Sequence, residues 1–237
     1  MNNDMIYIPV DVIHAFMIDT FKAQGVSDED AQICADVLIA SDLRGIESHG
    51  VGRLKYYYDR IQMGVQFPTA QMEIVKDDGA TALIDGHHGM GHPTAYRSMK
   101  LAMQKAKQYG IGAVAVRNTT HFGIAGYYPL MAVKEGLIGF TVTNARPSIT
   151  PTFGAEPMLG TNPIAFAAPS DMDYPFCFDG ATSICQRGKV EVADRAGKPI
   201  PAGWVTSSEG ELMTDPAQIL VDLGKDKAAL LPLGGAG

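Results

Sequence analysis

Residues 42–53 read DLRGIESHGVGR, and the rest of the chain is organised around this segment. It brings a hydroxyl (Ser48), an imidazole (His49) and a guanidinium (Arg53) within six residues, among glycines that allow the backbone to turn sharply. An imidazole can carry a proton near neutral pH, and a guanidinium can bind a carboxylate through two parallel hydrogen bonds. The segment therefore predicts a site for a small oxo or hydroxy acid, with a helix–helix corner as the alternative.

The composition is that of a globular protein. The 237 residues are 46% hydrophobic and 19% charged, which is enough for a sizeable core in one large domain or two small ones. A formal net charge of -7 without any basic run argues against a nucleic-acid surface. Three cysteines without a C-x-x-C pair are typical of free thiols in a reducing compartment: Cys34, Cys177 and Cys185. We find neither a signal peptide nor an apolar run long enough to cross a bilayer, and expect a cytoplasmic protein without membrane contact.

Helical periodicity dominates the N-terminal part of the chain. It predicts a first helix that begins near Pro9 and ends before Gly25, and a second with Ser27 as its N-cap. A third helix is expected from Leu54 to about Gly64, and its tyrosines at helical spacing are typical of a core. We therefore expect an N-terminal helical domain over residues 1–70. The predicted buried face of the first helix consists of Ile13, Phe16, Met17 and Phe21.

Strand signals prevail in the second predicted domain, residues 71–237, which makes the fold a mixed α/β class. The expected elements are a hairpin over 72–84, a helix to about 109, a short buried strand over 112–117, a helix to 135, strands over 137–143, 164–168 and 176–178, and a short helix near 215–223. Residues 187–215 are rich in turn-forming and polar residues, and no regular element is predicted there.

Two groups of histidines follow the opening segment. His87, His88 and His92 invite a metal interpretation, but Asp85 is the only carboxylate nearby and the segment is full of turn residues. We expect a solvated loop that enters a helix, and no metal site. His121 instead follows the predicted strand over 112–117 in a polar turn, and ligands of α/β proteins commonly bind at such strand ends.

Familiar nucleotide and hydrolase motifs are absent from the sequence. It contains no G-x-G-x-x-G, no P-loop, no G-x-S-x-G and no H-E-x-x-H. The residues by themselves therefore predict a small-anion site built on His49, Arg53 and His121, and do not decide the reaction.

Seven motifs nevertheless occur in a recognisable order: SHGVGR at 48–53, NTTHFGIAGYY at 118–128, LGTNP at 159–163, DGATS at 179–183, RGK at 187–189, IPAGW at 200–204 and LPLGG at 231–235. Together they resemble the malate/L-lactate dehydrogenase family, whose relatives include sulfolactate, ureidoglycolate and diketogulonate enzymes and a cyclic-imine reductase. The resemblance implies a non-Rossmann fold in which a largely antiparallel sheet flanked by helices binds NAD or NADP. It also implies a homodimer whose active site lies between domains.

The resemblance also implies a reaction, the interconversion of a small 2-hydroxy acid (malate- or lactate-like) and its 2-oxo acid by hydride transfer. It assigns the acid–base role to His49, with Ser48 beside it in a relay and His121 as the rival. Arg53 and Thr161 are implied to contact the substrate. The residues implied to bind the cofactor are His121, Phe122, Gly123, Asp179, Gly180 and Ala181.

Two alternatives to this dehydrogenase remain open at the level of the sequence. One is a truncated, catalytically silent family member that acts as a structural or interaction protein, and the other is a cyclic-imine reductase. Gly180 departs from the family pattern, because relatives usually carry Met or another larger residue there.

The relatives implied by the resemblance continue past Gly235 for about another third of their length, whereas this sequence ends at Gly237. We therefore expect the NAD(P)-binding domain over 71–237 to be incomplete at its C-terminal end, with unpaired strand edges and exposed apolar surface. We predict that the 237-residue chain alone binds NADH poorly in a fluorescence titration. Sub-micromolar affinity, or turnover without a complementing chain, would contradict this prediction.

Overall fold

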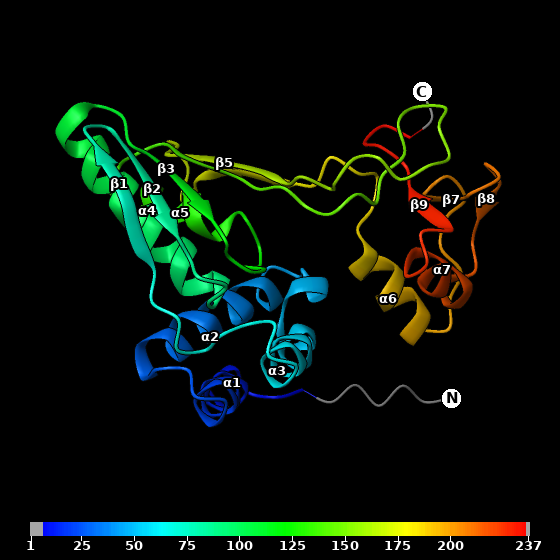
Figure 1. The fold of residues 1–237 in the computed structure, drawn as a ribbon, viewed down its shortest axis with the longest axis horizontal. Helices are drawn as coiled ribbons and strands as arrows, with labels where there is room; N and C mark the ends of the chain where they lie inside the picture. The colour runs from blue at the N-terminus through cyan, green and yellow to red at the C-terminus, as the bar shows by residue number, and fades with distance from the viewer. Residues whose placement is uncertain (1–6, 236–237) are drawn as a thin grey trace. The chain divides into compact units, whose positions relative to one another are not determined.

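The N-terminal helices form where the apolar periodicity predicts them. In the computed structural model, which describes residues 7–235, they are α1 (Val10–Ala23), α2 (Asp28–Asp42) and α3 (Leu54–Gln62) (Figure 1). The predicted N-cap is confirmed, because the Ser27 hydroxyl accepts a hydrogen bond from the Asp30 amide at 3.2 Å. Acidic residues in the first turn of α2 add a favourable interaction with the helix dipole.

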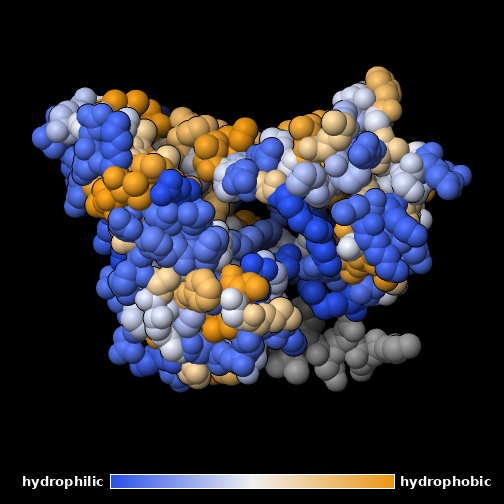
Figure 2. Space-filling model, in the orientation of Figure 1, coloured by the Kyte–Doolittle hydropathy of each residue, from blue (hydrophilic) through white to orange (hydrophobic). Residues whose placement is uncertain are grey.

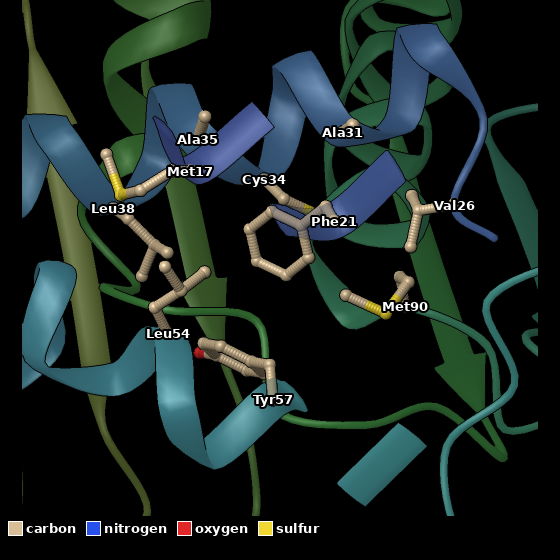
Figure 3. Packing of buried hydrophobic residues seen from close by; sticks show 10 residues of the cluster. All are labelled: Met17, Phe21, Val26, Ala31, Cys34, Ala35, Leu38, Leu54, Tyr57 and Met90. Carbon is tan, nitrogen blue, oxygen red and sulfur yellow. The ribbon is translucent and has the colours of Figure 1, made fainter. Parts of the chain in front are cut away.

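A shared apolar core holds these three helices together (Figure 3). Met17 and Phe21 are buried as predicted, but Phe16 is 56% exposed. Residues 17 and 21 are four positions apart and share one helical face, whereas Phe16 is turned about 100° away from Met17 and leaves that face. The buried members of this core are Met17, Phe21, Val26, Ala31, Cys34, Ala35, Leu38, Leu54, Tyr57 and Met90.

A small mixed sheet follows the helices. The predicted hairpin is confirmed as β1 (Glu73–Asp78) and β2 (Thr81–Asp85), which pair antiparallel, and β3 (Ala113–Arg117) pairs parallel with β2. Helix α4 (Gly91–Tyr109) connects the two parallel strands, as a parallel pair requires. The prediction that β3 is buried is wrong: it is an edge strand, and its side chains alternate between exposed and half-buried. Helix α5 (Tyr127–Val133) ends this part of the chain.

The remaining strands form two further three-stranded sheets, in which every pairing between named strands is antiparallel. One sheet has the order β4-β5-β6 and the other β8-β7-β9. The mixed α/β class with largely antiparallel pairing is thus confirmed, although the strands form several small sheets. The strands are β4 (Gly139–Val142), β5 (Ile164–Ala168), β6 (Phe176–Gly180), β7 (Val205–Ser207), β8 (Leu212–Met213) and β9 (Ala228–Leu230).

The expectation that residues 187–215 lack regular structure is wrong. They contain α6 (Arg187–Arg195) as well as β7 and β8. Helix α6 is short and mostly polar, but Val190 is fully buried in a core that it shares with Ile219 of α7 (Pro216–Leu223). Tertiary packing therefore stabilises a helix whose local sequence is dominated by polar residues.

The chain packs as two units that divide between Leu137 and Ile138. The predicted boundary at residue 70 lies inside the first unit, because α4 packs against α2 there. The division of the protein into domains over 1–70 and 71–237 stays a prediction.

The surface of the described chain carries both hydrophilic and apolar residues. On the face seen in Figure 2, apolar side chains gather in several groups separated by hydrophilic ones. Within residues 7–235, no helix has both the length and the apolar character that crossing a membrane requires.

Candidate active site

The segment over 42–53 folds as two short 3-10 turns between α2 and α3. They are Glu47–His49 and Val51–Arg53, with Gly50 between them. The Asp42 carboxylate lies where a side chain at Gly50 would be, and it accepts a hydrogen bond from the Val51 amide at 2.7 Å. A side chain at this position would displace the Asp42 carboxylate and break this hydrogen bond, so glycine lets the end of α2 hold the turn that carries the histidine.

The three side chains predicted from this segment lie together. The Ser48 hydroxyl is 2.9 Å from Nδ1 of His49. The Arg53 Nε–H donates to the Ser48 carbonyl oxygen at 2.7 Å, and the Arg53 guanidinium carbon lies 5.9 Å from the centre of the Tyr56 ring. The serine, the imidazole and the guanidinium therefore belong to one local arrangement at the start of α3.

His121 completes this arrangement from a distant part of the sequence, the loop between β3 and α5. Its ring stacks on that of His49, with centres 5.5 Å apart and planes inclined by 26°. Its Nδ1 lies 2.6 Å from the Tyr57 hydroxyl and accepts a hydrogen bond from the Gly123 amide at 3.3 Å. The structure thus brings together the two histidines that the sequence singled out.

Burial keeps both imidazoles uncharged at neutral pH. It lowers the pKa of His49 to about 4, with a further contribution from Arg53. Burial likewise lowers the pKa of His121 to about 3, and the neighbouring His49 is the next cause. Burial also raises the pKa of the Tyr57 phenol well above its ordinary value, so this group stays protonated.

The hydrogen bonds of His121 assign its tautomer. A backbone amide can only donate, and the protonated Tyr57 phenol has its hydrogen available, so Nδ1 of His121 is the acceptor. The ring proton of neutral His121 is therefore on Nε2. Among the described residues, the hydrogen-bond partner of Nδ1 of His49 is the Ser48 hydroxyl. A hydroxyl can either donate or accept a hydrogen bond.

Two side chains of the site were missed by the sequence reasoning. Tyr57 was expected to be a core residue; it is fully buried, yet its hydroxyl contacts His121. His92, which was expected in a solvated loop, is the second residue of α4 and is 0% exposed. Its ring lies edge-on to Tyr57 with centres 4.7 Å apart, and neither ring nitrogen has a hydrogen-bond partner among the described residues. For Tyr57, the sequence did contain a signal of its place in the site: it lies one helical turn after Arg53.

The other histidines of that group lie outside the site. His87 and His88 are exposed, and Nε2 of His87 is 3.0 Å from a carboxylate oxygen of Glu73. Among residues 7–235, no three His, Cys, Asp or Glu side chains are arranged to hold a metal ion.

Gly123 and Phe122 border the histidine pair on the side of the core. Gly123 has a φ of +79°, and a Cβ there would lie 2.6 Å from Cγ1 of Val37 and 3.3 Å from Cδ2 of His92. Packing against α2 and α4 accounts for the glycine. Phe122 is half-buried and its carbonyl accepts a hydrogen bond from the Tyr128 hydroxyl. Their assignment to cofactor binding stays a prediction.

The other predicted site residues lie in the second unit. Thr161 precedes β5, and its carbonyl accepts hydrogen bonds from the Thr182 amide at 2.8 Å and the Thr182 hydroxyl at 3.0 Å. Asp179 and Gly180 end β6, and Ala181 follows. The structure thereby joins the motifs at 159–163 and 179–183, whose roles toward substrate and cofactor stay predictions.

The comparison with known proteins identifies the family. Residues 8–236 match the family model described as malate/L-lactate dehydrogenase, and the chain belongs to this family. It is 48% identical over 237 residues to a malate dehydrogenase of Pyrococcus horikoshii, which covers 100% of this chain and 64% of that protein. It is 43% identical over 219 residues to an L-sulfolactate dehydrogenase of Methanocaldococcus jannaschii, covering 92% of this chain and 62% of that one.

A solved structure agrees with this assignment. The crystal structure of malate dehydrogenase from Entamoeba histolytica matches with a TM-score of 0.95 and 46% identity, over 98% of this chain and 64% of that chain. The present chain therefore spans less than two thirds of the length of these relatives. The relatives named here are dehydrogenases of 2-hydroxy acids, and the predicted family is confirmed.

The buried state of His92 predicts how stability depends on pH. Burial lowers the pKa of His92 to about 3, so below about pH 6.5 the unfolded chain takes up a proton there that the folded chain does not, and the free energy of unfolding falls as the pH drops. Replacing His92→Leu removes this term. The loss of stability between about pH 6.5 and about pH 5 should then shrink by at most about 2 kcal/mol, measured by urea denaturation.

His88→Leu is the matched control for the loss of an imidazole, because the His88 side chain is exposed and lies outside the site. An unaltered pH dependence in the His92→Leu protein would show that His92 is not held neutral by the fold.

Proposed function

We propose that this chain forms part of an NAD(P)-dependent oxidoreductase that interconverts a small 2-hydroxy acid, malate- or lactate-like, and its 2-oxo acid by hydride transfer. The observation that carries the proposal is the stacked pair of His49 and His121, both neutral, beside the guanidinium of Arg53. The family to which the chain belongs supports the same reaction.

His49 is the proposed acid–base group. Its Nδ1–H can donate to the Ser48 hydroxyl, which leaves Nε2 unprotonated and able to take the proton of a substrate hydroxyl. His121 is less suited to this step, because its Nδ1 already accepts two hydrogen bonds and its Nε2 carries the proton. His121 would instead donate a hydrogen bond to the substrate oxygen, and this stabilises the charge that develops there.

Arg53 is the proposed ligand of the substrate carboxylate. Its Nε–H donates a hydrogen bond to the Ser48 carbonyl oxygen, so the guanidinium and the neighbouring His49 imidazole are fixed relative to each other. A carboxylate bound there would place the adjacent carbon and its oxygen near the histidines, and fixed orientation of this kind lowers the barrier of the chemical step. The negative charge of the acid would also raise the pKa of His49, which favours the protonated form needed for reduction. Thr161 is proposed as a further substrate contact.

The family implies a nicotinamide cofactor, and the described residues fit one. Asp179 is exposed at the end of β6, where its carboxylate can accept hydrogen bonds from ribose hydroxyl groups. Gly180 and Ala181 would present backbone beside it, and Phe122 and Gly123 border the histidine pair. When bound, the cofactor accepts or supplies the hydride. We propose NAD or NADP, and in addition a homodimer in the cytoplasm.

Histidine substitutions test this proposal in the full-length protein. We expect His49→Asn to lower kcat/KM for oxidation of L-malate by roughly 100- to 10,000-fold, because a positioned acid–base group contributes about this much. His121→Asn should cost less, since it removes a hydrogen-bond donor and leaves the base in place. Steady-state rates with NAD and with NADP measure both effects.

His88→Asn serves as the control and should retain the rate of the unmodified enzyme, because His88 is exposed and outside the site. A larger loss in His121→Asn than in His49→Asn would reverse the assignment of the two histidines. A lack of turnover by the unmodified enzyme with every 2-hydroxy acid would refute the proposed function.

A further inference from the structure

Helix α3 presents a second cation on the side of the histidine pair. Arg53, at its N-cap, is followed at helical spacing by Tyr56, Tyr57 and Arg60, which are three, four and seven positions further along. Residues with this spacing share one face of a helix. Since Tyr57 contacts His121 through its hydroxyl, this face is the one that borders the site.

The ring of Tyr56 is close to both cations. The guanidinium carbon of Arg53 is 5.9 Å from the ring centre, and that of Arg60 is 5.4 Å from it. The same ring meets His121 edge-on, with centres 6.0 Å apart. Arg60 and His121 are therefore both neighbours of the Tyr56 ring, and the positive charge of Arg60 is among the causes that lower the pKa of this histidine.

No carboxylate of the described chain neutralises Arg60. None of the ion pairs within residues 7–235 includes it, and the adjacent Asp59 is paired with Lys55 at 2.6 Å. Nε of Arg60 is buried without a hydrogen-bond partner in the same part of the chain. A buried donor without a partner costs free energy, and an anion bound at the guanidinium would offset this cost.

We propose that Arg60 binds a second acid group of the substrate. This inference rests on the proposed function and makes it more specific: the site prefers 2-hydroxy acids that carry a distal carboxylate or sulfonate over lactate-like monoanions. Arg53 takes the carboxylate beside the reacting carbon, and Arg60 takes the distal anion. The flat fork of a guanidinium matches the oxygens of either acid group, and two separate cations orient a dianion in one direction.

The test compares three substrates in the full-length enzyme: L-malate, sulfolactate and L-lactate. We expect Arg60→Gln to lower kcat/KM for the two dianions by roughly 10- to 100-fold more than for lactate, because a charge-assisted hydrogen bond is lost only for the distal anion. Arg60→Lys keeps the positive charge but lacks the planar guanidinium, and it should retain part of the preference for dianions over lactate. Circular dichroism and thermal unfolding verify that each variant is folded.

Arg44→Gln is the matched control. The Arg44 side chain is exposed, donates to the carbonyl of Ala40 and lies outside the proposed site, so its replacement should not change the substrate ratios. Equal losses for dianions and lactate in Arg60→Gln, or no loss for either, would overturn the role of Arg60 while the dehydrogenase assignment stands. If the unmodified enzyme turns over none of the 2-hydroxy acids, the proposed function fails and this inference fails with it.

Discussion

The hydrogen bond between the Tyr57 hydroxyl and Nδ1 of His121 is the contact on which the rest of the site depends. It joins residues 64 positions apart in the sequence and connects α3 to the loop before α5. Tyr57 is fully buried among the side chains of α1 and α2, with its ring 6.2 Å from that of Phe21 (Figure 3). The hydrophobic core of the first unit therefore fixes the position of a polar group that selects the tautomer of His121.

The same constraint separates the roles of two chemically identical side chains. His49 and His121 stack on each other and are both kept neutral by burial, yet their hydrogen bonds differ. An imidazole whose Nδ1 accepts a hydrogen bond from a phenol presents a donor at Nε2, whereas one beside a serine hydroxyl can present an acceptor. Different surroundings of paired titratable groups commonly define which is acid and which is base. The cations of α3 then supply the charge that an acidic substrate requires.

The sequence predicted the parts of this site that depend on local spacing. Ser48, His49 and Arg53 lie within six residues, and their proximity follows from the chain itself. His121 was recognised because it follows a strand. Tyr57 was not, because a tyrosine at helical spacing is typical of a core, and its hydroxyl partner is set by tertiary packing. His92 was assigned to a loop for a similar reason: its burial depends on how α4 packs. Helix α6 was not predicted because its stability comes from the burial of Val190. The polar local sequence does not indicate that burial.

The most direct test of the account is the tautomer and charge of His121, measured by ¹H–¹⁵N correlation spectra of the imidazole groups in protein labelled at histidine, with His121→Asn to assign the signals. We predict a neutral ring with its proton on Nε2 throughout the range in which an ordinary histidine titrates, near pH 6.5, because burial lowers the pKa of His121 to about 3. In Tyr57→Phe, the Nδ1 signal should shift as the hydrogen bond is lost. A proton on Nδ1, or titration near the ordinary pKa, would contradict it.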